Sequence, residues 1–98
     1  MFIKTRSQII NSSRITRIYV DTSERGFNTV VIEIADGFNF NEYTGASYPA
    51  FKTIPVYGEE RGTGEGLCNE LIKALFSAIE SPESFDADEW ISERKARR

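Results

Sequence analysis

The sequence contains no histidine and only one cysteine, Cys68. A single cysteine excludes an intramolecular disulfide, and a zinc site would have to be built from carboxylates and that one thiolate. A nucleophilic thiol needs a neighbouring base, and histidine cannot supply it here. We therefore expect no metal site, no cofactor and no catalytic residue, and we interpret Cys68 as an inert thiol on the apolar side of a helix.

Long hydrophobic runs are also missing. No apolar stretch approaches the ~18 to 20 residues that span a bilayer, and the start, MFIKTRSQIINSSR, lacks the features of a signal peptide. We therefore expect a cytoplasmic protein that does not contact a membrane. With 98 residues, of which 40% are hydrophobic and 28% charged, the composition predicts a single soluble domain, 1–98, with one core.

Acidic residues are absent from the first twenty positions, which hold four cations. The last five residues, RKARR, hold four more cations, whereas residues 21–93 hold all fifteen acidic residues and only four basic ones. The formal net charge is −3. The chain is therefore acidic in the middle and basic at both ends.

The first half of the sequence alternates with the period of two that a strand imposes. The clearest strands are the β-branched stretches RITRIYVDT and FNTVVIEIADG. The turn signal SERG between them predicts an antiparallel hairpin. Asp36-Gly37 is expected to end the second strand.

Shorter strands are expected on both sides of this hairpin. FIKT and QII are upstream candidates, and FNFNEY and AFKTIPVYG are downstream ones, with TGASYP as a loop. Pro55 indicates an edge or a strand end, because proline has no N–H to give to a ladder. These stretches predict a strongly bent antiparallel meander of four to six strands over about residues 2–57.

The second half changes to a helical period. Apolar residues recur at steps of one and three over 67–80, which predicts an amphipathic helix that ends before Pro82. A second helix is expected over about 86–97, with Asp86 as N-cap and Glu89 as its capping-box partner. The predicted centre of the core consists of Ile18, Val20, Ile32, Ile34, Leu71, Leu75 and Ile79.

The stretch GEERGTGEG, residues 58–66, is rich in glycine but does not match a phosphate-binding loop. Its last glycine gap is too short for a dinucleotide fingerprint, and the Gly-Lys-Ser/Thr of a P-loop is absent. Its glutamates would also repel an anion. We interpret it as a joint between sheet and helix. The carboxylate groups at Glu59-Glu60 and around Asp86 are explained by solvation and helix capping rather than by acid–base catalysis.

Aromatic residues are numerous, and five of them fall within fourteen positions: Phe38, Phe40, Tyr43, Tyr48 and Phe51. Trp90 lies on the short terminal helix. A small core has little room for all of them, and an exposed apolar patch on a small protein marks an interface. The alternative is that they close the core over the sheet. We take Tyr43, Tyr48, Phe51 and Trp90 as the candidate partner interface.

The basic end of the chain offers a second hypothesis, nucleic-acid binding. Cations at a helix end can contact phosphates, and the candidate contacts are Arg94, Lys95, Arg97 and Arg98. The acidic net charge and the lack of aromatic residues among these cations count against it. Cations that complement the negative end of a helix are the simpler interpretation.

The string MFIKT, followed by IIN, RITRIYV, VVIEIADG and YGEE before a long helix, resembles a class of small bacterial and phage-borne proteins, mostly uncharacterised. The resemblance covers about two thirds of the chain. It implies a curled antiparallel sheet with a C-terminal helix and carries over no catalytic residues. The aromatic insertion NFNEYTGASYPAF and the second helix depart from that pattern.

The sequence therefore predicts an α+β fold, in which a bent antiparallel sheet is covered by a long amphipathic helix and followed by a short one. The favoured function is a non-enzymatic protein-interaction module that self-associates through an exposed sheet edge, the aromatic segment or the Trp90 helix. The alternative is weak nucleic-acid binding through the basic C-terminal helix.

Overall fold

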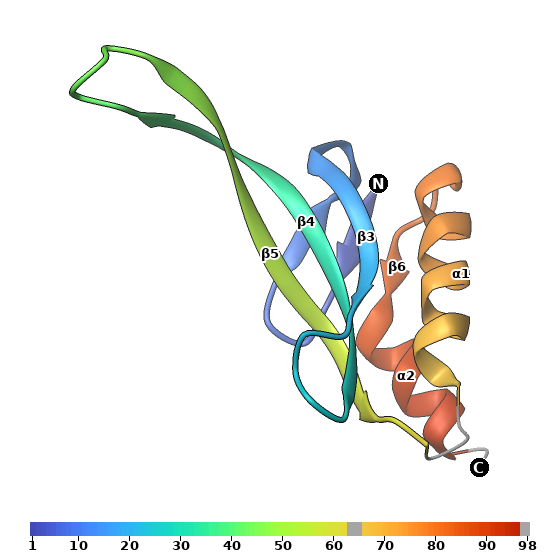
Figure 1. Ribbon diagram of the computed structural model, residues 1–98. Coiled ribbons are helices and arrows are strands. Elements are labelled where there is room, and N and C mark those ends of the chain that lie inside the picture. Colours follow the sequence, from blue (N-terminus) through green and yellow to red (C-terminus); the bar gives the residue numbers. More distant parts are fainter. Residues whose placement is uncertain (63–65, 97–98) are drawn as a thin grey trace.

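The computed structural model of the protein describes residues 1–62 and 66–96. Its fold is α+β, which confirms the predicted class, and Figure 1 shows the long strands on one side and the helices on the other. In chain order the elements are β1 (Phe2–Lys4), β2 (Ile9–Asn11), the 3-10 helix η1 (Ser12–Arg14), β3 (Ile15–Asp21), β4 (Phe27–Phe40), β5 (Ser47–Glu60), α1 (Leu67–Glu80), β6 (Phe85–Asp86) and α2 (Ala87–Ala96).

The larger sheet has the order β3-β4-β5 and is a bent antiparallel meander as predicted, but with three strands instead of four to six. The hairpin between β3 and β4 forms as expected, with Ile18 opposite Ile32. The second strand is longer than predicted, because Asp36-Gly37 does not end it. The pairing continues past them with a shift in register between Ala35 and Phe38, which is a β-bulge. Residues 47–49, expected in a loop, belong to β5.

The remaining strands form a separate sheet with the order β2-β1-β6. Strand β1 pairs antiparallel with β2 and parallel with β6, whose Phe85 lies opposite Ile3. The sequence predicts no strand at 85–86, because a two-residue strand is too short to show a period. The described strands thus form two three-stranded sheets, which flank one core.

Helix α1 has the predicted bounds, and its apolar side faces the core. Leu67, Leu71 and Leu75 have no exposed surface. Burial of each such side chain contributes roughly 1.5 to 3 kcal/mol. Among the predicted core residues, Ile79 and Val20 are only half-buried at the margin of the cluster. The fully buried Ile3 was missed, because a three-residue strand gives little pattern.

Helix α2 begins as the capping pattern predicts, one residue later than expected. The backbone N–H of Glu89 donates to Oδ1 of Asp86 over 3.0 Å, so Asp86 caps the helix. Ala87 and Ile91 are buried against the core cluster. The predicted end of the helix at residue 97, together with Arg97 and Arg98, lies outside the described residues, and so do residues 63–65 of the expected joint.

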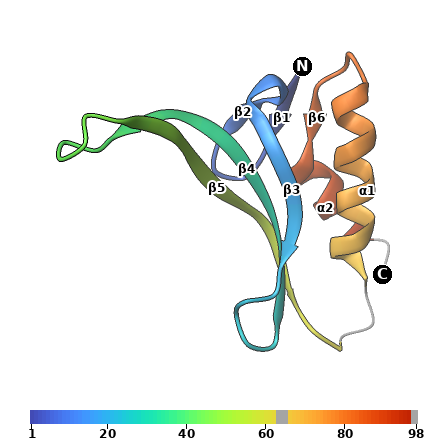
Figure 2. The same ribbon diagram turned by 45° about the horizontal axis from the view of Figure 1, so that its top comes forward.

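The most conspicuous feature of the shape is an arm, defined here as residues 35–51. Strand β3 pairs with β4 only as far as Ile34, which lies opposite Ile15. Beyond that point β4 and β5 continue as a two-stranded ribbon that leaves the body on the side away from the helices (Figures 1 and 2). The arm gives the molecule its elongated dimensions of 54 × 36 × 20 Å.

Candidate protein-interaction surface

The base of the arm is held by Arg14. Its guanidinium Nη2 donates to the carbonyl oxygen of Ala35 over 2.9 Å, and Nε donates to the same oxygen over 3.3 Å. The same group forms an ion pair with Asp36 at 3.4 Å. Charge-assisted hydrogen bonds of this kind fix geometry better than neutral ones. Arg14 therefore fixes the chain where the ribbon loses its third strand.

The bulge that follows sets the direction of the arm. Asp36 and Gly37 are the extra residues between the Ala35–Phe51 pair and the Phe38–Pro49 pair. Gly37 has a φ of +77°, a left-handed conformation that side chains other than glycine rarely adopt. A bulge bends the strand and increases its twist. The Asp-Gly signal in the sequence therefore corresponds to a bend in a continuous ribbon.

The tip of the arm is an ordered loop between Asn41 and Ala46. The Asn41 N–H donates to the Ala46 carbonyl and the Gly45 N–H donates to the Asn41 carbonyl, both over 2.8 Å. The Asn41 side-chain oxygen also accepts from the backbone N–H of Tyr43 over 3.0 Å. These bonds hold a compact turn that presents Tyr43, whose side chain is 93% exposed.

Strand register places most of the arm's apolar side chains on one face. Residues opposite each other in an antiparallel pair share a face, and so do residues two apart on one strand. Phe38 lies opposite Pro49, and Phe40 lies opposite Ser47. Phe38, Phe40, Pro49 and Phe51 therefore form one face of the ribbon, here called the aromatic face. Tyr48 lies on the other face, opposite Asn39.

The aromatic face is open to solvent. Phe38 is 76% exposed, Phe40 67% and Phe51 55%. The interpretation that these aromatic residues close the core is therefore wrong, because the ribbon carries them away from the core into solvent (Figure 1). Sequence analysis did not single out Phe38 and Phe40 as interface residues. The signal that could have found them is their alternation with Asn39 beyond the last core residue of β4.

The outer face of the body is covered by its own polar side chains up to the arm. The guanidinium of Arg17 lies 4.1 Å from the centroid of the Tyr19 ring and pairs with Glu33 at 3.2 Å. Val31 is buried on this side although it lies outside the core cluster. The uncovered aromatic surface of this sheet therefore begins at Phe51, where the arm begins.

The structure does not bring Trp90 together with the arm. Trp90 is half-buried on α2 and contacts the core cluster, on the helical side of the molecule. The Arg94 guanidinium carbon lies 4.9 Å from the Trp90 ring centroid, and Lys95 Nζ lies 5.0 Å from that of Tyr57. The two described cations of the basic helix end thus rest on aromatic rings of their own chain.

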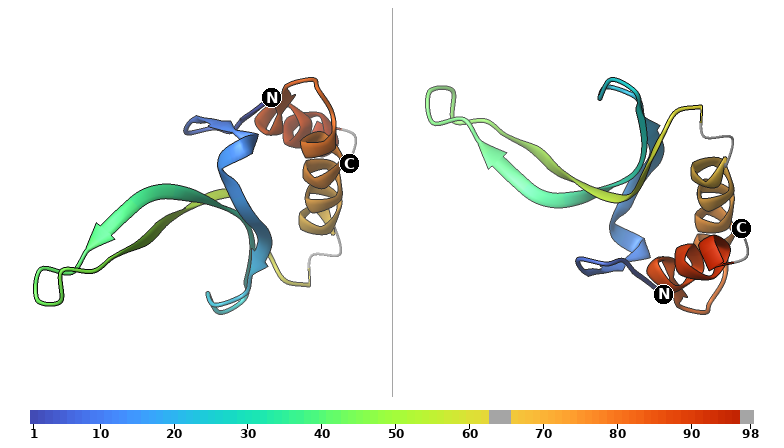
Figure 3. Two further views of the ribbon diagram at one scale, coloured as in Figure 1. Left: turned by 90° about the horizontal axis from the view of Figure 1, so that it is seen from above. Right: turned by 90° about the horizontal axis from the view of Figure 1, so that it is seen from below.

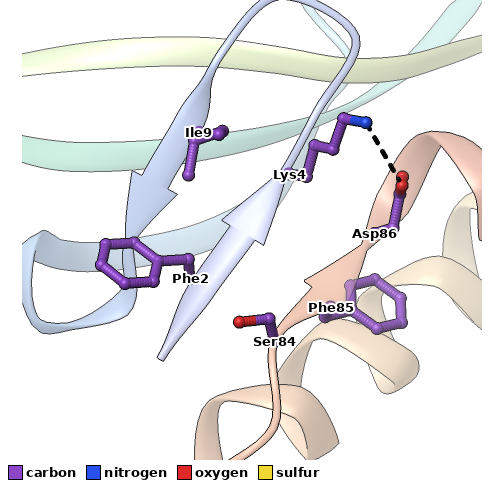
Figure 4. Close-up of a pocket in the computed structure, with 6 residues that line it drawn as sticks. All are labelled: Phe2, Lys4, Ile9, Ser84, Phe85 and Asp86. Carbon is purple, nitrogen blue, oxygen red and sulfur yellow. Dashed lines mark ion pairs between the residues drawn. The ribbon is translucent and has the colours of Figure 1, made fainter.

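A second apolar surface lies over the small sheet (Figure 4). It is a hollow of about 400 Å³, lined by Phe2, Lys4, Ile9, Ser84, Phe85 and Asp86. Phe2 is 50% exposed and Ile9 67% exposed, on the face opposite the buried Ile3 and Ile10. One ion pair, between Lys4 and Asp86 at 3.7 Å, crosses its edge.

Glu59 has a structural role at the start of α1. Gly66 offers no side chain to cap the helix, and the first-turn N–H of Cys68 instead donates to Oε1 of Glu59 on β5 over 3.2 Å. A carboxylate suits the positive end of a helix dipole. The pKa of the Cys68 thiol is raised to about 12. Burial is the largest cause, followed by the hydrogen bond and the negative charge of Glu59. Cys68 is therefore held as a buried, protonated thiol.

The described residues contain no group of three or more Cys, Asp or Glu side chains that could hold a metal ion. In that part of the chain every buried side-chain nitrogen and oxygen atom has a hydrogen-bond partner. Among the described helices none is long and apolar enough to cross a membrane. The feature that the fold leaves unexplained is the arm.

In comparisons with known proteins, no protein-family model, no curated protein and no solved structure matches the chain. The resemblance to phage-borne proteins therefore stays a prediction.

Proposed function

We propose that the protein is a non-enzymatic, cytoplasmic interaction module that self-associates, and that the arm is its binding element. One observation carries the proposal: three phenylalanine side chains, each more than half exposed, share one face of a projecting two-stranded ribbon. A face of this kind gains free energy when another surface covers it.

The stability of the arm supports this reading. A two-stranded hairpin is marginally stable in water unless a third strand or a packed surface supports it. The arm has neither beyond Ile34, although its base and tip are fixed by specific hydrogen bonds. A partner that covers the aromatic face would supply the missing support. The arm is therefore better explained as half of an interface than as an element that stabilises the fold.

The edge of β5 is a poorer binding element than the face of the arm. Strand β5 lies at the edge of its sheet and carries Pro49 and Pro55, which have no N–H to donate. Proline and lysine on an edge strand discourage pairing with another chain, and Lys52 lies between these two prolines. Recognition through side chains of the aromatic face is therefore favoured over the addition of a strand.

Light scattering after size exclusion tests the proposal. The unmodified protein is expected to elute as a dimer or larger species, and Phe38→Ser/Phe40→Ser as a monomer with an unchanged circular dichroism spectrum. Phe76→Ser is the matched control, because Phe76 is 52% exposed on α1 and far from the arm. A strict monomer at all concentrations, or dimers that survive the arm substitutions, would contradict the proposal.

One further measurement distinguishes nucleic-acid binding from self-association. Salt-sensitive retention on DNA that is lost in Arg94→Ala/Lys95→Ala and kept in Phe38→Ser/Phe40→Ser would favour it over self-association. The contacts of Arg94 and Lys95 with aromatic rings give no support to that reading, because both cations already have a partner in the fold.

A further inference from the structure

We propose that the aromatic face of one copy docks into the hollow over β1, β2 and β6 of a second copy, so that two copies exchange arms reciprocally. This inference rests on the proposed self-association and names the surface that receives the arm. Each copy then contributes one arm and one hollow, which is the arrangement that a two-fold symmetric dimer requires.

The hollow has the chemistry to receive aromatic side chains. Its exposed apolar residues are Phe2 and Ile9, from adjacent strands, and Phe85, which packs against the core cluster, lines its edge. A volume of about 400 Å³ falls in the range of about 300 to 1,000 Å³ typical of pockets that enclose apolar groups. The inner face of β1 and β2 buries Ile3 and Ile10 in the core. The outer face carries the exposed Phe2 and Ile9 and is uncovered.

The arm cannot fill the hollow of its own chain in this structure. The views from the side and from above and below show the arm leaving the body, with its tip far from β1, β2 and β6 (Figures 1 and 3). Arg14 and the bulge fix its direction at the base. An occupant for the hollow must therefore come from another molecule, and a second copy of this chain carries a suitable one.

The arm is acidic, whereas the hollow carries the Lys4–Asp86 ion pair and lies next to the cation Arg6. Residues 36–51 contain two acidic residues, Asp36 and Glu42, and no cation. The hollow includes Lys4, which is 63% exposed, and Arg6 follows in the exposed turn after β1. Asp36 is already paired with Arg14 and Lys4 with Asp86, so Glu42 at the tip and Arg6 after β1 are the charges placed to approach each other. Opposite charges at the rim orient an apolar contact and raise the rate of encounter.

Complete cover of the aromatic face in both copies would reach the lower limit of area for a specific dimer. Aromatic side chains bury about 150 to 250 Å² each when covered completely, so the exposed parts of Phe38, Phe40 and Phe51 amount to roughly 300 Å² per arm. Counting two arms and two receiving surfaces, reciprocal exchange removes about 1,200 Å² from water, which is the lower bound for standard specific interfaces. A single arm in a single hollow would fall well below it.

The first experiment compares arm and hollow variants by light scattering. Phe38→Ser/Phe40→Ser disables the arm, and Phe2→Ser/Ile9→Thr disables the hollow while keeping residues that suit an exposed strand. Each is expected to raise the dimer dissociation constant by at least about tenfold, because buried aromatic anchors dominate interfaces. Tyr48→Ser, on the other face of the arm, is the control and is expected to leave dimerisation unchanged.

The second experiment identifies the contact directly. Tyr43→Cys protein is mixed with Ile9→Cys protein and treated with a short bismaleimide; the native thiol, Cys68, is buried and does not compete. Cross-links between Tyr43→Cys and Ile9→Cys chains support the docking. Cross-links only between two Tyr43→Cys chains would show that arms pack against arms and would overturn it.

The outcomes separate this inference from the proposed function. A dimer that survives the hollow substitutions but not the arm substitutions overturns the docking and retains self-association through the arm. A protein that is monomeric without any substitution overturns both. Loss of dimers in both sets of variants, together with the mixed cross-link, supports both.

Discussion

At the scale of single residues, the contact between Glu59 and Cys68 shows how a carboxylate in a glycine-rich stretch serves folding. The carboxylate accepts from the first turn of α1 and lies beside the buried thiol. The burial of Cys68, and after it the hydrogen bond and negative charge of Glu59, disfavour the thiolate and raise the pKa of the thiol. The same contact explains why the glutamate before the glycines needs no catalytic or phosphate-binding role.

The raised pKa of Cys68 predicts a pH dependence. In the folded protein the thiol keeps its proton up to a pH of about 12, whereas in the unfolded chain it loses it near its ordinary value of 9.0. The folded state therefore binds more protons between these values, so the free energy of unfolding falls as pH rises through this window. Urea titrations at pH 8 to 11 are expected to show a smaller fall in Cys68→Ala than in the unmodified protein.

A comparison with Glu59→Gln sharpens this test. Glutamine can still accept from the Cys68 N–H but carries no charge, so the pKa of the thiol is expected to fall and its alkylation to become faster at pH 9. Glu24→Gln, in the exposed turn after β3, is the matched control. Equal alkylation rates in all three proteins would show that Glu59 does not influence the thiol.

At the scale of elements, the arm shows that alternation in a sequence predicts a strand but does not tell whether the strand lies over the core or projects into solvent. The pattern of β4 is the same before and after Asp36-Gly37, yet one half pairs with β3 over the core and the other projects into solvent. The end of the pairing with β3, at Ile34, is what separates the half of β4 over the core from the half in the arm. Helix α1 was predicted to the residue, because burial on one side and polarity on the other show directly in its sequence.

The short elements were not predictable in the same way. Strand β6 has two residues, and its pairing with β1 joins positions more than eighty residues apart. No local pattern records such a contact. For the candidate surface, the sequence indicated Tyr43, Tyr48 and Phe51 by composition. The register is what places Phe38 and Phe40 on one face with Phe51, and Tyr48 on the other.

Arg14 offers a prediction for the arm as an element. Replacement by alanine removes the hydrogen bonds to the Ala35 carbonyl, which at an exposed site contribute about 0.5 to 1.5 kcal/mol. Hydrogen exchange of arm amides between residues 38 and 50 is expected to accelerate by roughly two- to tenfold under conditions where the protein is monomeric. Amides at Val30 and Ile32 are expected to be unaffected.

The control for this measurement is Arg25→Ala, which removes a cation from the exposed turn between β3 and β4. Exchange in the arm is expected to be unchanged in that variant. If Arg14→Ala accelerated exchange equally throughout the body, Arg14 would support the whole sheet and would not specifically position the arm.

At the scale of the whole molecule, the chain divides into a body that contains the core and an arm that contributes nothing to it. No residue from 36 to 50 is buried. Arg17 on β3 and Arg94 on α2 cover aromatic and polar surface of the body, while the apolar side chains of the arm lie uncovered. Such a division is expected when one part of a protein is selected for folding and another for binding.

Removal of the arm tests this division. Replacing residues 36–50 by Asn-Gly joins the paired residues Ala35 and Phe51 through a two-residue turn that suits a hairpin. The shortened protein is expected to unfold cooperatively with a Tm within a few degrees of the original, and to be monomeric by light scattering. Loss of cooperative unfolding would show instead that the arm is needed for the body to fold.

The parallel pairing of β1 with β6 has a consequence for synthesis in the cell. During synthesis β2 follows β1 closely and can pair with it at once. The other edge of β1 stays unpaired until Phe85 and Asp86 of β6 have left the ribosome. By then β4 and β5, which are adjacent in sequence, have had time to pair. The phenylalanine side chains of the arm are thus exposed before the hollow that we propose as their docking site is complete.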